Sequence, residues 1–149
     1  MFRLVSTWEL PVAADRAWQV IADVADWPTW WPGMSSTVVV RPGGLDAIGQ
    51  RTAIVVRSPL AFRLRFGVEI TEASAPTFAR ARVVGDLVGS GTWEVAPTAD
   101  GSRATITWHV RPGREPLRSL AQPLAGPLTW SHAHVMTGGH AGLMRRLGR

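Results

Sequence analysis

The sequence of 149 residues predicts one domain of the α+β class, in which a curved antiparallel sheet of about seven strands wraps around a long C-terminal helix. Segments that alternate apolar and polar side chains follow one another from Phe2 to Arg111, as strands with one buried face do. Short breaks rich in glycine and proline separate them, which favours antiparallel hairpins in a meander. The last third of the chain, from about Pro116 to Leu147, carries apolar residues at helical spacing instead.

The first strand is expected from Phe2 to Leu10, because its side chains alternate and Pro11 ends the pattern. This segment lacks the charged and then apolar layout of a signal peptide. A short helix is expected next, with Asp15 near its start, where the helix dipole favours an acid, and an end by Pro28. The apolar residues that follow helical spacing in it are Ala17, Trp18, Ile21, Val24 and Ala25.

Residues 26–33 contain three tryptophans and two prolines, which form neither a regular helix nor a strand. We expect a stiff aromatic turn or a single helical turn there. Two roles are open for it. The aromatic rings either plug one end of the core or form the rim of a pocket.

Six further strands follow in the alternating part of the chain. Every second side chain of a strand faces the same side, so the even-numbered residues from Phe62 to Ile70 should face the closing helix. Gly89 and Gly91 weaken a strand but allow the sheet to bend around that helix. The expected strands are Thr37 to Arg41, Arg51 to Ser58, Ala61 to Thr71, Thr77 to Val84, Leu87 to Ala96 and Arg103 to Arg111.

The closing segment should form a long helix, because its apolar residues recur at intervals of three, four and seven. A helix of about 30 residues is roughly 45 Å long and could cross the whole sheet. Pro123 and Pro127 each remove a donor, so the helix should kink or begin late, after a separate turn at Leu117 to Leu120. The apolar stripe consists of Leu117, Leu120, Leu124, Leu128, Val135, Met136, Leu143 and Leu147.

Small residues interrupt this stripe, and two readings of them are open. They either allow close approach of the helix to its neighbours or leave a cavity that a ligand fills. The small residues are Ala121, Ala125, Gly138, Gly139 and Gly142.

Composition excludes several classes of protein. The chain has no cysteine, which excludes a disulfide framework and fits a reducing, cytoplasmic location. Residues 119–144 contain no acidic or basic side chain, but their histidines, prolines and hydroxyl groups make membrane insertion costly, so no stable membrane insertion is expected.

All sixteen basic residues are arginine, and the net charge is +5. Several of them fall on the outward side of adjacent strands, where Glu69, Glu72 and Glu94 offset part of the charge. We expect a solvated outer face, and the alternative is a surface for an acidic protein partner. Nucleic acid is not expected, because no aromatic side chains are interleaved to stack bases. The arginines concerned are Arg51, Arg57, Arg63, Arg65, Arg80 and Arg82.

Four groups of residues carry a family resemblance through their order and spacing. They are Trp8 with Pro11 and Trp18 ahead of Ile21 to Val24, Asp26 to Pro28 running into Trp30 to Gly33, Gly85 to Leu87 with Gly89, Gly91 and Trp93, and a tail with Trp130, His132, Val135, Met136, Gly139, Gly142 and Leu143. Nearly the whole chain, taken as one domain over residues 1–149, thereby resembles the START-like, helix-grip superfamily (SRPBCC), in its polyketide cyclase/dehydrase and lipid-transport branch.

This resemblance implies an elongated apolar cavity between the sheet and the closing helix, with access near the Trp-Pro segment and the hairpin tips. Members of the superfamily range from lipid carriers and hormone receptors to aromatase/cyclases and chaperone co-factors. Their shared fold therefore implies a cavity rather than one activity.

Nine residues are the candidates for contact with a ligand in that cavity, with His132 as the polar anchor. The candidates are Trp31, Leu64, Phe66, Leu87, Trp93, Trp108, Leu128, His132 and Met136.

For proton transfer, the chain has no tyrosine, so the polar candidates are His132, Trp93, Trp108 and a strand-end group such as Arg57 or Ser58. A half-buried imidazole at His132 would exchange protons near neutral pH. The alternative is a core histidine bonded to a backbone carbonyl or water. No catalytic residue is assigned.

No metal or cofactor is expected. His132 and His134 are two residues apart and so point to different sides of a helix, and no carboxylate lies at a ligand spacing.

Three functions follow from these patterns. The first is binding of a small or chain-like hydrophobic molecule, such as a lipid or polyketide-like compound. The second is a cyclase or dehydratase acting on a bound poly-ketone, and the sequence leaves open whether any reaction is catalysed. The third is a regulatory or stress-related interaction module that uses the arginine face.

Overall fold

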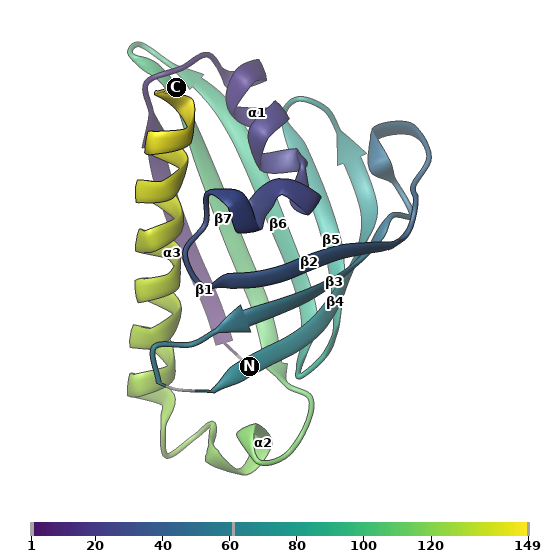
Figure 1. Cartoon of the computed structure of the whole chain (residues 1–149), viewed down its shortest axis with the longest axis vertical. Helices are drawn as coiled ribbons and strands as arrows, with labels where there is room; N and C mark the ends of the chain where they lie inside the picture. Colours follow the sequence, from purple (N-terminus) through teal and green to yellow (C-terminus); the bar gives the residue numbers. More distant parts are fainter. Residues whose placement is uncertain (1, 61, 149) are drawn as a thin grey trace.

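A computed structural model describes residues 2–60 and 62–148 (Figure 1). Ala61, which the sequence assigns to a strand, and the end residues Met1 and Arg149 of the expected domain lie outside the described residues. The elements are β1 (Phe2–Leu10), α1 (Ala14–Ala22), η1 (Val24–Thr29), β2 (Met34–Arg41), η2 (Leu45–Ala47), β3 (Arg51–Arg57), β4 (Arg63–Ser74), β5 (Phe78–Gly85), β6 (Leu87–Thr98), β7 (Gly101–Pro112), α2 (Leu117–Leu120) and α3 (Ala125–Leu147).

The strands form one antiparallel sheet in the order β1-β7-β6-β5-β4-β3-β2. Figure 1 shows the sheet curving, with α3 alongside β1 and with α1 and η1 covering the upper part of the hollow. This is the helix-grip fold that the sequence predicts. The strand bounds differ from the predicted ones by about three residues or fewer, as is usual at element ends.

The closing helix begins late, as the two prolines predict. A separate turn, α2, precedes α3, and Pro127 falls in the first turn of α3, where a missing backbone donor leaves no helical hydrogen bond unmade. Because the helix starts at Ala125, Leu120 and Leu124 are not part of its buried stripe and are 44% and 38% exposed. The predicted stripe is therefore wrong at these two leucines.

The second half of α3 packs directly on the tryptophan-rich segment. A Cβ atom added at Gly142 would overlap the carbonyl oxygen of Trp30, and one at Gly139 would overlap the ring of Trp31. Of the two readings of the small residues, close approach is correct at these positions.

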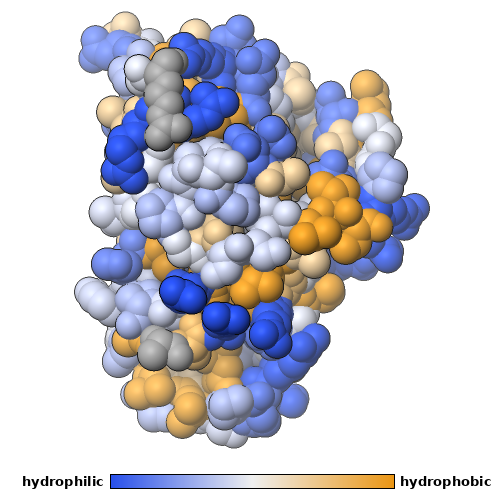
Figure 2. All heavy atoms as spheres, viewed as in Figure 1, coloured by the Kyte–Doolittle hydropathy of each residue, from blue (hydrophilic) through white to orange (hydrophobic). Residues whose placement is uncertain are grey.

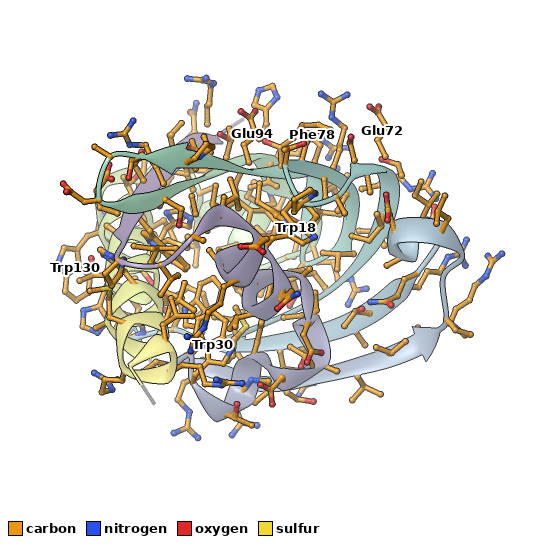
Figure 3. All side chains as sticks on the ribbon, turned by 90° about the horizontal axis from the view of Figure 1, so that it is seen from above. Trp18, Trp30, Glu72, Phe78, Glu94 and Trp130 are labelled. Atoms are coloured by element: carbon orange, nitrogen blue, oxygen red, sulfur yellow. The ribbon has the colours of Figure 1, made fainter. Side chains whose placement is uncertain are left out.

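The same packing explains the segment 26–33. Trp27, Trp30 and Trp31 are all buried, and Nε1 of Trp27 donates to the carbonyl oxygen of Ile21 at 2.9 Å. Figure 3, seen from above, places Trp30 between η1 and α3. Trp27 and Trp30 therefore plug the core, while Trp31 reaches the cavity described next.

Candidate ligand-binding cavity

A cavity of about 130 Å³ lies between the concave face of the sheet and the first half of α3. Its walls come from both edges of the sheet as well as its centre, because the curvature brings β1 and β2 toward the same helix. The lining residues are Phe2, Leu4, Trp31, Met34, Val56, Ser58, Phe62, Leu64, Phe66, Leu87, Trp108, Val110, Pro112, Leu117, Leu128, Thr129, Ser131, His132, Val135 and Met136.

Strand alternation places the sheet side chains inside. On β4, Leu64 and Phe66 face the hollow, whereas the alternating residues Arg63 and Arg65 are exposed. The ring of Phe66 meets the ring of Trp108 edge to face, with centroids 5.9 Å apart and an interplanar angle of 83°. This is a favourable arrangement for an aromatic pair. The two rings form a rigid part of the wall.

The outer side of the cavity lies near α2. Leu64, Leu87, Leu117 and Leu128 are half-buried, while Trp31 is buried on the inner side. Access near the hairpin tips therefore agrees with the structure, but access at the Trp-Pro segment does not, because Trp31 is only 5% exposed. Figure 2 shows hydrophobic side chains gathered at this lower end of the molecule.

Eight of the nine candidate residues line this cavity, namely Trp31, Leu64, Phe66, Leu87, Trp108, Leu128, His132 and Met136. The exception is Trp93, which lines a second cavity of about 190 Å³ near α1. Trp93 follows Leu87 by six residues on β6, which is about 20 Å at the rise of a strand. Alternation gives the side of the sheet but not the position along the strand, so grouping Trp93 with the others is wrong.

Sequence reasoning also missed several lining residues. Phe2 and Leu4 share a face of β1 with Trp8, so their alternation carries a signal for them. Ser131 has no such signal, because a serine on a helix is usually exposed. It is 6% exposed here.

Two hydroxyl groups form a buried polar pair in the wall. The Oγ atoms of Ser58 and Ser131 lie 2.8 Å apart and share a hydrogen bond, and the backbone N–H of Leu60 donates to Oγ of Ser58 at 3.0 Å. This pair links the end of β3 to the first turns of α3. Ser58, one of the polar candidates, therefore lies in the cavity wall.

His132 lies beside this pair on α3. Its Nε2 atom is buried and has no hydrogen-bond partner among the described residues. Burial lowers the pKa of His132 to about 4, because a charged imidazolium loses hydration. The imidazole is therefore neutral at pH 7. This pKa contradicts the expected proton exchange near neutral pH, and Nε2 bonds no backbone carbonyl among the described residues.

The cavity contains no charge to offset this burial. None of its described lining residues is acidic or basic, whichever element they come from. Among the described residues, no group of three His, Asp or Glu side chains is placed to hold a metal ion.

The arginine face lies on the opposite, outer side of the sheet. Figure 3 shows Glu72, Phe78 and Glu94 along that side, away from the helices. Arg82 pairs with Glu69 at 3.1 Å and Arg80 with Glu72 at 3.1 Å.

Arg51 also pairs with Glu69, and its hydrogen bond is the main reason that the pKa of Glu69 lies below its usual value. Glu69 and Glu72 thus offset the arginines as predicted, while Glu94 forms no ion pair among the described residues. One aromatic side chain does lie on this face, because the guanidinium of Arg80 sits 5.7 Å from the centre of the Phe78 ring.

The fold and the apolar cavity define a START-like protein. The family model described as "Polyketide cyclase / dehydrase and lipid transport" matches residues 1–148, and the chain belongs to that family. Comparison with curated proteins gives no match. No helix in the described part of the chain is long and apolar enough to cross a membrane.

Solved structures share the fold at low sequence identity. A protein of Thermus thermophilus has a TM-score of 0.78 at 16% identity, over 97% of this chain and 99% of its own. The Zhui aromatase/cyclase from Streptomyces sp. R1128 has a TM-score of 0.73 at 15% identity, over 99% and 96%. A START superfamily protein from Mycobacterium smegmatis has a TM-score of 0.70 at 12% identity, over 95% and 98%. Likeness at these identities concerns the fold alone.

Proposed function

We propose that this protein binds a small or chain-like hydrophobic molecule in the cavity between the sheet and α3. One observation carries the proposal, which is that sixteen of the twenty described lining residues are apolar and none of these twenty is charged. Ligand pockets combine such walls with a few polar groups that fix orientation. Ser58, Ser131 and His132 are groups of this kind.

The volume limits what the cavity holds without rearrangement. An apolar cavity of roughly 150 Å³ admits a molecule the size of benzene, and this one measures about 130 Å³. A lipid chain or a polycyclic compound therefore requires outward movement of the wall. Leu117 on α2 and Leu128 in the first turn of α3 are half-buried on the outer side, so moving them exposes less new surface than moving a fully buried residue such as Trp31.

The test has two parts: detection of a molecule that co-purifies with the protein, and titration of the protein with hydrophobic probes. Mass spectrometry under native conditions should detect a hydrophobic compound that co-purifies, and titration calorimetry should show that 1-octanol or toluene binds at micromolar to millimolar concentration. A protein that retains nothing and takes up neither probe would end the proposal.

A second candidate is a cyclase or dehydratase acting on a poly-ketone held in the same cavity. The family description and the aromatase/cyclase among the structural neighbours support it, as does the unpartnered imidazole of His132 in the wall. Because that imidazole is neutral at pH 7, it would accept a proton rather than give one. His132→Ala should abolish turnover while the fold and ligand binding persist, and unchanged turnover would remove this residue from the reaction.

The arginine face supports a third proposal, an acidic protein partner. Arg57 and Arg63 face each other across β3 and β4, and neither has an acidic partner among the described residues. A pull-down in which the amount of captured partner falls as the salt concentration rises would support such a partner.

A cytoplasmic location likewise stays a prediction, and fractionation of cells that produce the protein is its test.

A further inference from the structure

The wall of the cavity discriminates by charge. Eight elements or their adjoining turns contribute to it, and the described lining residues include no Arg, Asp or Glu. Burying a carboxylate without a counter-charge costs many kcal/mol, so an anion would leave its water without compensation. His132 supplies no counter-charge either, since its pKa of about 4 keeps it neutral at pH 7. A charged group is therefore disfavoured inside this cavity.

The polar end of the cavity has unused hydrogen-bonding capacity. Ser58 and Ser131 together carry two hydroxyl protons, and their mutual hydrogen bond uses one of them. The N–H of Leu60 occupies a lone pair of Ser58 rather than a proton. One hydroxyl proton is thus left without an acceptor in the hydrogen bonds of the described residues. The same wall contains Nε2 of His132, which also has no hydrogen-bond partner among them.

Leaving a buried polar atom unsatisfied costs about 1–3 kcal/mol, so an occupant that satisfies it gains affinity. A hydroxyl group is both donor and acceptor. It can accept the spare serine proton, and it can pair with Nε2 whether or not that nitrogen carries the proton. A ketone oxygen can only accept, and a hydrocarbon does neither.

We infer that the cavity selects an uncharged hydrophobic ligand that carries a hydroxyl group, and that this hydroxyl lies against Ser131 and His132 at the first turns of α3. The inference rests on the proposed function, because it specifies the ligand of the same cavity. It separates alcohols and phenols from fatty acids, which are anions at neutral pH.

The experiment is a calorimetric titration at pH 7 with three probes, namely 1-octanol, octanoate and toluene. We expect 1-octanol to bind at least about tenfold more tightly than octanoate, a difference of roughly 1.4 kcal/mol. Ser131→Ala and His132→Leu should each weaken 1-octanol binding by about twofold to tenfold, the range of one hydrogen bond, and should leave toluene binding within about twofold.

Each outcome decides one point. Octanoate binding as tightly as 1-octanol would overturn the selection by charge. A preference for 1-octanol that neither variant changes would overturn the placement of the hydroxyl. Toluene binding without either octyl probe would overturn the inference but keep an apolar binding cavity, whereas failure of all three probes would remove the proposed function together with the inference. Toluene binding by each variant also shows that the variant is folded.

Discussion

Two cavities lie along the same concave face, and the larger one is not the candidate site. On β4, Phe66 lines the cavity of about 130 Å³ and Ile70 lines the one of about 190 Å³, while the buried Val68 lies between them. The first cavity has no charged wall residue among those described, whereas Asp46 and Gln50 line the second. The carboxylate and the amide in the second wall can hydrogen-bond to water held in a cavity of this size. Volume alone therefore does not identify a binding site, and the chemistry of the wall does.

Filling each cavity in turn with a large side chain tests most strongly whether the ligand occupies the first cavity and not the second. Leu64→Trp places an indole in the first cavity and should remove detectable binding of 1-octanol, a loss of at least about thirtyfold, or roughly 2 kcal/mol. Gln50→Trp places the same ring in the second cavity and should leave binding unchanged. Titration calorimetry compares the two variants with the natural protein. If only Gln50→Trp lost binding, the ligand would occupy the second cavity, and the assignment to the first cavity would be wrong.

The two halves of α3 should also respond differently to one added methyl group. Gly142 packs against the carbonyl of Trp30, so Gly142→Ala should lower the free energy of unfolding by about 2–3 kcal/mol through overpacking. Gly126, in the first turn, has no atom beyond its chain neighbours within 4 Å of an added Cβ. Because Pro127 follows it and disfavours the helical conformation of a preceding residue with a Cβ, Gly126→Ala should change stability by less than about 0.5 kcal/mol. Urea denaturation measures both. Equal effects would mean that the second half of α3 is not held tightly against the tryptophans.

The neutral imidazole in the first cavity predicts a pH dependence of stability. The pKa of His132 is about 4 in the folded protein against 6.5 for an ordinary histidine, so the unfolded chain binds more protons between these values. Stability is therefore fully present above about pH 6.5 and falls by about 3 kcal/mol as pH drops toward 4. Denaturation at several pH values measures this fall.

The matched variants are His132→Gln, which should lose much of this pH dependence, and His134→Gln, which removes an exposed histidine and should keep it. If both variants kept the full pH dependence of the natural protein, His132 would not be a buried neutral group.

A smaller effect than that of His132 concerns the rim of the second cavity. Asp46 and Ala47 both have positive φ angles, of 54° and 62°, which strains a residue that has a side chain. Ala47→Gly should raise the free energy of unfolding by about 1 kcal/mol. Asp46→Gly should gain less, because the Asp46 carboxylate accepts a hydrogen bond of 3.4 Å from the N–H of Ala75. Thermal unfolding compares the two, and a larger gain for Asp46→Gly would show that this hydrogen bond contributes nothing.

Local patterns in the sequence predicted most of the fold, because alternation and prolines act on near neighbours. Alternation correctly predicted that Leu64, Phe66 and Trp108 lie on the concave side. The prolines correctly predicted that α3 begins late. Local patterns could not place Trp93, since its distance from α3 depends on how the strands pair and curve.

Features that depend on contacts between residues distant in the chain could not be predicted from the sequence. The role of Gly142 became clear only from its approach to Trp30, more than 100 residues earlier. The pKa of His132 depends on its burial among side chains that come from several distant elements. The Ser58–Ser131 pair joins residues separated by 73 positions, so no local motif predicts it.

Methyl NMR with labelled methionine and isoleucine tests the central claim most directly. Met34 and Met136 line the first cavity, Ile70 lines the second, and Met144 is 40% exposed on α3. During a titration with toluene, the ring should shift the methyl signals of Met34 and Met136 and leave those of Ile70 and Met144 in place. A shift of Ile70 without a shift of Met34 and Met136 would contradict the assignment of the ligand to the cavity beneath α3.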